Sequence, residues 1–409
     1  MSKVILSRWV PRQAQRMGRT FVLVAGLAAG VGLADRWDWS QREPKVAWEV
    51  AIGAGFSSVA VDDGRVFAFG NVADEDIVTA LDADRGEVRW QYRYPCRAMG
   101  IAKPDEPGPR ATPFVHAGAV YTLSRDGRLL CLDAATGRLR WWRDLPGEVG
   151  EKPPYWGFSG SPLRWNDLLI WSVGDHGLAI RASSGEVAWK STSRASTVWK
   201  TEPVGTSGYT TPQPVIYQGR QLVSLANESQ WVIVDPADGK LVWATPWEVP
   251  YGVTSAEPFL AGDRVVLSGG YGYGTRVVRI GSAGEPLWAN KNLRSHFANL
   301  AVVGEHLYGI DGNQQDGGRC ELRCLRLADG EVVWARERFG FANLTLVDQR
   351  LLILTARGEL VVVQPDPSGY RETGRIQVLG GESWTAPLVA GNRVFARNKQ
   401  GTLVRVDLP

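Results

Sequence analysis

The sequence predicts an all-β fold, an eight-bladed β-propeller made of four-stranded antiparallel blades. Two observations predict it: a Gly-x-x-x-Trp step that recurs along the chain, and a spacing of 45 to 54 residues between its successive tryptophans. A repeat of this length whose units read as strands is typical of a propeller. The repeated glycines are Gly86, Gly137, Gly185, Gly239, Gly284 and Gly330, and the repeated tryptophans are Trp90, Trp141, Trp189, Trp243, Trp288 and Trp334.

Each repeat contains the pieces of one blade. A short apolar run such as LLCLDA (129–134) reads as a buried strand. The turn that follows ends in Gly, which adopts positive φ without a Cβ clash. The Trp begins the next strand, and we expect its ring to fill the wedge between adjacent sheets, burying about 150–250 Å². Two further short runs precede each turn, so that one unit has four strands, A to D.

The last two units depart from the repeat. The seventh lacks its Trp, and GYRETGRIQV (369–378) forms its strand D with Ile376 near the Trp position. The eighth ends after strand C, at Pro409. Its missing strand is available in VAWEV (46–50), which carries Trp48. We therefore expect the N-terminal strand to pair with the C-terminal blade and close the ring, which removes exposed sheet edges.

The residues before the propeller divide into two segments. Residues 1–34 combine five basic residues with fourteen consecutive apolar residues, which indicates a signal peptide or an N-terminal membrane anchor. Fourteen is short for a spanning helix, which needs about 20, so cleavage or loose anchoring is favoured. Residues 35–45 are a polar linker, a plain tether unless its two tryptophans dock on the propeller rim. The propeller is predicted over 46–409.

Charge and cysteine usage exclude some functions. The formal net charge is +3, and because residues 1–34 hold five basic residues and no acid, the remainder carries −2. Nucleic-acid binding needs a concentrated basic surface, so we do not expect it. Cys96, Cys131, Cys320 and Cys324 permit disulfides in an exported chain. Cys131 reads as a buried small hydrophobe, although a Cys96–Cys131 bridge is conceivable, and no histidine pair has zinc-site spacing.

Three long connections between strand D of one blade and strand A of the next mark a possible partner surface. They span residues 94–110, 143–158 and 190–209 and come from neighbouring blades, so we expect them on one sector of one face. Mixed aromatic and charged residues suit a binding surface, whereas the plain interpretation is that the loops cap the rim. The candidate residues are Arg97, Lys103, Arg110, Tyr155, Trp156, Trp199 and Tyr209.

A second cluster lies near the inner strands, which line the central channel. Convergent polar groups in a funnel are the default hypothesis for a pocket. The competing interpretation is that asparagines at strand starts satisfy neighbouring backbone groups. The candidate residues are Asn292, Arg294, His296, Asn299 and Asn343.

The pattern Leu-Asp-Ala-x-x-Gly-x-x-x-Trp resembles the repeat of the pyrroloquinoline-quinone (PQQ) type propellers. That group contains quinoprotein alcohol dehydrogenases and the BamB-like outer-membrane assembly propellers, which bind no quinone. The dehydrogenases typically use an adjacent Cys-Cys disulfide and Ca²⁺ held by carboxylate and amide oxygens. This chain has no adjacent Cys pair, which argues against quinone binding.

The resemblance implies an exported, non-catalytic, monomeric scaffold that binds a protein or peptide in the cell envelope, with no metal and no cofactor. It would face away from the cytoplasm, and would touch the membrane through its N-terminal segment if that segment is uncleaved. The alternative is an oxidoreductase that holds PQQ with Ca²⁺ in the central funnel. A sugar-binding module or an enzyme using the aromatic loops is the third hypothesis.

Overall fold

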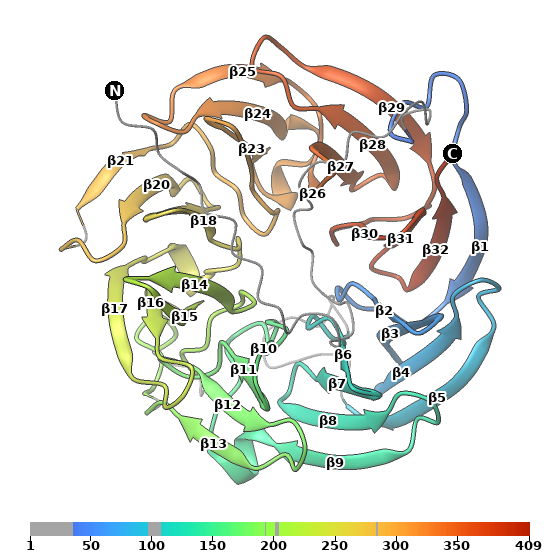
Figure 1. The fold of residues 1–409 in the computed structure, drawn as a ribbon, viewed down its shortest axis with the longest axis vertical. Coiled ribbons are helices and arrows are strands. Elements are labelled where there is room, and N and C mark those ends of the chain that lie inside the picture. Colours follow the sequence, from blue (N-terminus) through green and yellow to red (C-terminus); the bar gives the residue numbers. More distant parts are fainter. Residues whose placement is uncertain (1–35, 97–107, 193, 201–203, 284) are drawn as a thin grey trace.

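The structure, a computed structural model, describes residues 36–96, 108–192, 194–200, 204–283 and 285–409. In these residues the chain forms eight four-stranded antiparallel sheets around a central axis (Figure 1), so the predicted eight-bladed propeller is confirmed. The predicted signal or anchor segment, 1–34, lies outside the described residues. Within the described part of the chain, no helix has the length and apolar character needed to cross a membrane.

In every blade the four strands run from the innermost, A, to the outermost, D. The first four blades are β2 (Ala60–Asp62), β3 (Arg65–Val72), β4 (Glu75–Asp82) and β5 (Val88–Pro95); β6 (Phe114–His116), β7 (Ala119–Leu123), β8 (Arg128–Asp133) and β9 (Leu139–Asp144); β10 (Leu163–Trp165), β11 (Leu168–Trp171), β12 (Leu178–Arg181) and β13 (Val187–Lys190); and β14 (Gln213–Tyr217), β15 (Arg220–Ala226), β16 (Gln230–Val234) and β17 (Leu241–Pro246).

The remaining blades follow the same order, and the last takes its strand D from the start of the chain. They are β18 (Phe259–Ala261), β19 (Arg264–Gly269), β20 (Gly274–Arg279) and β21 (Pro286–Asn290); β22 (Ala301–Val303), β23 (His306–Asp311), β24 (Glu321–Arg326) and β25 (Val332–Arg336); β26 (Ala342–Val347), β27 (Arg350–Thr355), β28 (Glu359–Gln364) and β29 (Arg371–Gln377); and β30 (Leu388–Ala390), β31 (Arg393–Arg397), β32 (Thr402–Asp407) and β1 (Lys45–Ala51).

The repeated tryptophans join each blade to the next. Each indole Nε1 donates a hydrogen bond to a backbone carbonyl in the C–D hairpin of the following blade, at 2.8 to 3.3 Å. The ring lies on the hairpin glycine there: a Cβ added to Gly137 would come within 2.6 Å of the Trp90 ring. Gly137 also has φ +72. The Gly and Trp of one repeat therefore do not contact each other. Instead, the hairpin glycine of each blade contacts the tryptophan of the preceding blade.

The ring is closed at the junction of blades eight and one. Strand β1 pairs with β32, with Trp48 opposite Arg405, as the sequence predicts (Figure 1). Arg397 of β31 is 1 % exposed and donates to the carbonyl oxygens of Gly53 (2.9 Å), Ser57 (3.2 Å) and Phe69 (2.8 Å). Burial lowers the pKa of its guanidinium to about 9, so it still carries its proton at neutral pH. One buried cation thus joins both ends of the chain.

The seventh blade corrects one expectation and decides between two alternatives for the linker. By register, Gly374 and not Ile376 stands opposite Val362, where the other blades have their Trp. The missing ring is supplied by the linker, because Trp39 lies against Gly374, where an added Cβ would come within 2.5 Å of it. Trp37 and Trp39 are 2 % and 4 % exposed in the core between blades seven and eight. The linker is therefore a docked part of the fold and not a tether.

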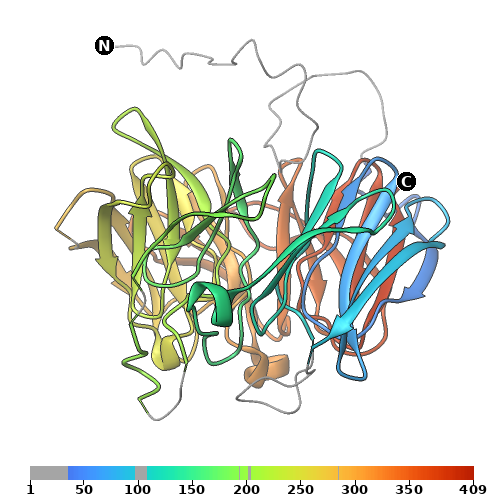
Figure 2. The same ribbon diagram turned by 90° about the horizontal axis from the view of Figure 1, so that it is seen from below.

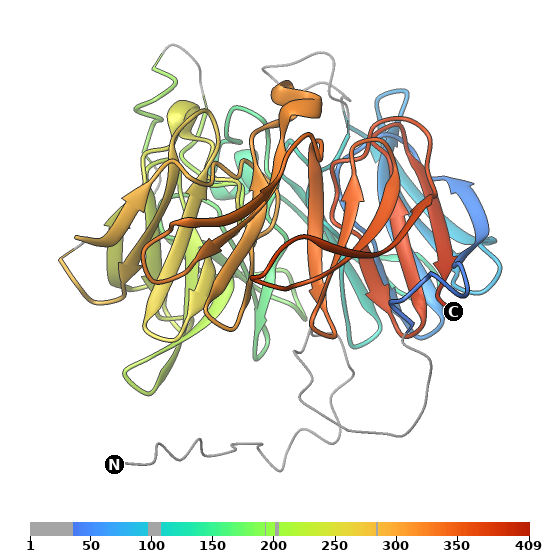
Figure 3. The ribbon, with the colours of Figure 1, turned by 90° about the horizontal axis from the view of Figure 1, so that it is seen from above.

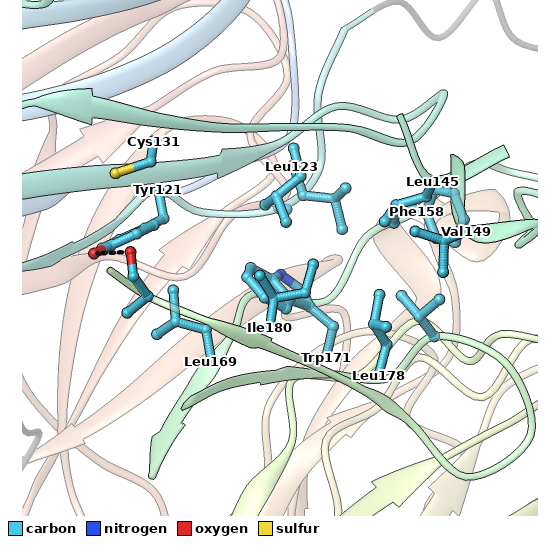
Figure 4. Packing of buried hydrophobic residues seen from close by; sticks show 14 of the residues in the cluster. Tyr121, Leu123, Cys131, Leu145, Val149, Phe158, Leu169, Trp171, Leu178 and Ile180 are labelled. Atoms are coloured by element: carbon cyan, nitrogen blue, oxygen red, sulfur yellow. Dashed lines mark hydrogen bonds between the residues drawn. The ribbon is translucent and has the colours of Figure 1, made fainter. Parts of the chain in front are cut away.

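The core consists of apolar clusters between neighbouring blades. Figure 4 shows the cluster between blades two and three, where Tyr121 packs beside Cys131 and donates to the carbonyl oxygen of Ala182 at 3.2 Å. All four cysteines are buried and none forms a disulfide, so the conceivable Cys96–Cys131 bridge is wrong. Cys131 is the buried small hydrophobe that its strand position predicts.

The ring has two distinct ends. The D-to-A connections and B–C hairpins form one, called here the loop end. The A–B and C–D hairpins form the other, the hairpin end. The loop end carries the short helical turns η3 (Pro250–Gly252) and η4 (Gln314–Arg319), which lie on the same face in Figures 2 and 3. A one-turn π-helix, η2 (Leu145–Val149), follows β9. Arg36, the first described residue, lies at the hairpin end, where it pairs with Asp348.

Candidate functional site

A cavity of about 690 Å³, called here the channel, follows the central axis. Side chains of the inner strands and of the connections before them line it. At the hairpin end its wall is formed by the ends of β26 and β30 and by Arg36. At the loop end its wall includes residues from both clusters that the sequence singled out, because the channel is lined there by Arg110, Trp156 and Tyr209 as well as His296, Asn299 and Asn343.

Aromatic rings from the starts of the inner strands form half of a belt around the loop end. Phe56 packs on Trp384 with ring centroids 5.2 Å apart, and Trp384 lies 5.5 Å from Phe297. Phe297 then contacts His296 at 4.8 Å. The guanidinium of Arg110 lies 5.0 Å from the centroid of Phe56, a cation–π contact that joins the first long connection to the belt.

The connections between blades supply the other half. His296 contacts Tyr271 at 4.7 Å, and Tyr271 contacts Tyr251 at 5.1 Å. Tyr251 lies 6.1 Å from Trp199. Trp199 stacks on Tyr155 at 3.6 Å with the two rings 7° from parallel. Two of the long connections therefore meet ring to ring on one sector of this face, as their origin in neighbouring blades predicts.

Trp156 and Tyr209 complete the belt on the channel side. Trp156 lies 4.7 Å from Tyr155 and 6.0 Å from Tyr209, whose hydroxyl oxygen accepts from the Trp156 backbone N–H at 3.4 Å. Burial raises the pKa of Tyr209, so its phenol stays protonated. We call the whole set the aromatic belt: Phe56, Tyr155, Trp156, Trp199, Tyr209, Tyr251, Tyr271, His296, Phe297 and Trp384.

Below the belt, side-chain oxygens satisfy the strand edges that face the channel. Thr112 Oγ1 accepts from the Ser58 N–H at 2.9 Å, and Ser161 Oγ accepts from the Thr112 N–H at 2.9 Å. Thr211 Oγ1 accepts from the Ser161 N–H at 3.2 Å. In the fifth blade a carboxylate takes this place, because Glu257 accepts from the backbone N–H of Thr211. In blades two to five, a side-chain oxygen of one blade thus accepts a hydrogen bond from the segment before the inner strand of the preceding blade.

Two of the three asparagines predicted for the funnel, Asn299 and Asn343, take part in the same capping. Asn343 Oδ1 accepts from the N–H of Asn299 and of Leu344, both at 2.9 Å. Its Nδ2 donates to the carbonyl oxygens of Phe297 at 3.2 Å and Trp384 at 3.1 Å. Asn343 lines the channel, but its polar atoms are occupied by backbone, which is the competing interpretation that the sequence left open.

Asn292 and Arg294 do not line the channel. Asn292 Nδ2 donates to the carbonyl oxygen of Gly330 at 2.9 Å, and Gly330 lies in the C–D hairpin of the following blade. Arg294 forms a bidentate ion pair with the buried Asp311, at 2.5 and 2.9 Å. Both residues are therefore structural in this arrangement. Arg97 and Lys103 lie outside the described residues.

The electrostatics of the channel are nearly neutral at the loop end. Glu257 is the sole carboxylate among the described residues that line this end. Burial raises its pKa, which favours the protonated form. His296 is 4 % exposed, and burial lowers its pKa to about 4, so its ring is uncharged at neutral pH. Arg110 is the sole cation among the same described residues.

Sequence reasoning missed several belt residues. Tyr271 lies in GGYGYGTR (269–276), a stretch that resembles a phosphate loop but forms the B–C hairpin between β19 and β20. Phe56 and Trp384 precede short strands outside the Gly-x-x-x-Trp repeat. The signal available in the sequence was an aromatic residue shortly before strand A in most blades, as in Phe297 and Phe341.

The sequence of the chain matches a known protein family. The family described as outer membrane protein assembly factor BamB matches residues 37–108 and 98–336 of the chain. The chain belongs to the BamB family. BamB of Shewanella oneidensis is 23% identical over 361 residues, which are 73% of this chain and 85% of that protein. The dehydrogenase subunit of the quinone alcohol dehydrogenase of Acetobacter aceti is 33% identical over 85 residues, but these are 20% of this chain and 12% of the enzyme.

Solved structures share the architecture of this BamB-family chain. BamB from Moraxella catarrhalis superposes with a TM-score of 0.62 at 15% identity, over 89% of this chain and 98% of that one. The quinohemoprotein alcohol dehydrogenase of Comamonas testosteroni superposes with a TM-score of 0.66 at 13% identity, over 91% of this chain and 78% of that one. At such low identity these likenesses show the fold alone.

Proposed function

We propose that this BamB-family propeller is a non-catalytic, monomeric scaffold of the cell envelope that binds a protein or peptide partner at its loop end. The observation that carries the proposal is the aromatic belt. Tyr, Trp and Arg are the residues that most often dominate the binding energy of protein interfaces, and here they are concentrated at one end of the ring. The envelope location is supported by the S. oneidensis relative, an outer membrane protein assembly factor, and by the apolar segment at 21–34.

The belt offers the partner an exposed part and a recessed part. Tyr251 is 53 % exposed, and its ring lies next to the half-buried Trp199. The Trp199 indole donates to the Tyr251 carbonyl oxygen at 3.0 Å, which ties two connections together. Rings held in place by such contacts lose little conformational entropy when a partner binds, so they suit an anchor role.

Alanine substitution tests the proposal. Trp199→Ala removes the ring that joins two connections, and we expect it to abolish co-purification of the partner from envelope extracts. The matched control is Trp142→Ala, which removes a 42 % exposed indole from the outer strand β9. Equal recovery of the partner with both variants would place the binding surface elsewhere.

A second candidate function, a PQQ-dependent alcohol dehydrogenase, has the same degree of support from fold similarity. The donor set of the channel does not fit it. Ca²⁺ prefers several ionised carboxylate and free carbonyl oxygens. The described residues at the loop end offer one carboxyl group of raised pKa, Glu257, while the amide oxygen of Asn343 already accepts two backbone hydrogen bonds.

Mixing the purified protein with PQQ and Ca²⁺ separates the two functions. The scaffold proposal expects an unshifted quinone spectrum and no dye-linked oxidation of ethanol. Saturable quinone binding with turnover would instead establish the dehydrogenase.

A further inference from the structure

A half-buried arginine between blades four and five has no carboxylate partner among the described residues. Arg276 of β20 places its guanidinium 4.9 Å from the centroid of the Trp247 ring. Its Nη2 donates one long hydrogen bond to Thr245 Oγ1, at 3.5 Å. Its Nε is buried without a hydrogen-bond partner in the described part of the chain, and Nη1 also has no such partner but is not buried. Burial lowers the pKa of this guanidinium, and no described carboxylate opposes the effect.

The equivalent arginine of blade six is neutralised by two carboxylates. Arg276 and Arg323 each precede the residue that stands opposite the tryptophan of their blade. Arg323 pairs with Asp311 at 3.1 Å and with Glu321 at 2.8 Å. By register, the same two places in blade five are both glycines, Gly269 and Gly274. Blade five therefore has glycines where blade six supplies the acidic partners of its arginine.

The fold does not require a charge at this position. In the six other blades the residue at the same register position is uncharged and almost completely buried. These residues are Thr79, Leu130, Leu178, Val232, Val361 and Val404. A partly desolvated charge without a counter-ion lowers stability, so an apolar residue would serve the packing at least as well. A charge that lacks a counter-ion in the described part of the chain indicates one that a partner supplies.

The guanidinium of Arg276 is continuous with the aromatic belt. Trp247, on which it lies, packs against Tyr273 with ring centroids 4.8 Å apart. Tyr273 lies in the same B–C hairpin as Tyr271 of the belt, and Trp247 lies on the same connection as Tyr251. Tyr251 and Tyr271 contact each other at 5.1 Å. The arginine and its two supporting rings therefore adjoin the exposed part of the belt at the loop end.

We infer that Arg276 binds the carboxylate of an Asp or Glu side chain of the protein partner, beside the aromatic anchor at Tyr251. The inference rests on the proposed function, because it names the chemistry of the partner at that same surface. The cation–π contact with Trp247 holds the guanidinium in place, and Nη1 donates to the carboxylate. The partner segment therefore carries an acidic residue near the group that packs on the belt.

The test uses the partner that co-purifies with the wild-type chain and is lost with Trp199→Ala, purified and titrated against the full chain by calorimetry. Arg276→Met keeps the aliphatic packing on Trp247 and removes the charge. It should weaken binding at least about tenfold, the loss of one charge-assisted hydrogen bond, while the melting temperature stays the same or rises. The matched control, Arg323→Met, removes a paired arginine at the equivalent position and should lower the melting temperature without changing the affinity.

A charge reversal identifies the pair. Arg276→Glu should abolish binding, and replacing one Asp or Glu of the partner by Arg should restore it. Unchanged affinity of Arg276→Met at a wild-type melting temperature would overturn the inference and leave the Trp199-dependent binding intact. A loss of affinity that no charge reversal in the partner restores would also overturn it, since Arg276 would then act through packing. If no partner depended on Trp199, the proposed function would fail and this inference with it.

Discussion

At the scale of single residues, buried titratable groups govern how the protein responds to pH. Asp76 in β4 is 1 % exposed and accepts from Asn71 Nδ2 at 2.9 Å and from the Tyr94 hydroxyl at 3.2 Å. These bonds favour the carboxylate, but burial outweighs them and raises the pKa of Asp76 to about 6. In the unfolded chain this group titrates near its ordinary value of 3.8.

Asp76 should therefore make stability fall as pH rises. The folded protein holds the proton up to about pH 6, whereas the unfolded chain loses it near pH 4, so the contribution is complete below pH 4 and is lost above about pH 6, roughly 3 kcal/mol in all. Asp76→Asn removes this dependence. Urea unfolding across this range should show wild-type stability declining relative to the variant, and parallel curves would mean that Asp76 ionises normally.

The cysteines should be chemically inert in the folded protein. Burial raises the pKa of all four thiols, for example that of Cys131 to about 11, and the reactive thiolate is suppressed. Iodoacetamide followed by mass spectrometry should label none in the native state and all four after unfolding, without a reductant. A pair that labels only after reduction would reveal a disulfide.

At the scale of elements, contacts between blades explain the repeat. Gly137→Ala places a Cβ 2.6 Å from the Trp90 ring, whereas Gly118→Ala in the same blade has similar positive φ, +69, but only a side-chain tip at 3.8 Å. In both variants the alanine must adopt a strained left-handed backbone conformation. We expect the free energy of unfolding of Gly137→Ala to fall by about 1–3 kcal/mol more than that of Gly118→Ala, because of overpacking. Chemical unfolding measures both. Equal losses would show that backbone conformation alone selects glycine here.

The linker should be as important to stability as a blade tryptophan. Trp39→Ala empties the slot over Gly374, and we expect it to destabilise the protein by about 3–5 kcal/mol, the usual range for a buried aromatic residue. The control is again Trp142→Ala, which should change stability little. A small loss of stability in Trp39→Ala would show that the linker is a tether that contributes little to the fold.

The blades were predictable because glycines such as Gly137 and tryptophans such as Trp90 recur at a regular spacing. The closing strand was predictable because residues 46–50 carry a tryptophan, Trp48, and the last blade lacks a strand D. The replacement in blade seven was not predictable, since Trp39 and Gly374 are far apart in sequence and only the closed ring brings them together. The site shows the same division. His296 and Trp156 were selected by residue type, whereas the turning of Arg294 towards Asp311 depends on a pairing that no local pattern reveals.

At the scale of the whole molecule, the two ends of the ring carry different residues. The linker fixes Arg36 at the hairpin end through Asp348 and the Gly391 carbonyl, at 2.7 Å for the latter. The aromatic belt lies at the loop end. An N-terminal attachment to the membrane would therefore leave the belt facing away from the point of attachment, where a partner can reach it.

The most direct test of the account is site-specific photo-crosslinking in the cells that make the protein. A benzophenone amino acid at position 251, where Tyr251 is 53 % exposed at the loop end, is compared with one at position 216. Ile216 is 73 % exposed and lies in β14, next to the A–B hairpin of blade four at the hairpin end. The account predicts a discrete covalent adduct with a partner from position 251 and none from 216. Adducts from 216 alone, or equal adducts from both positions, would contradict it.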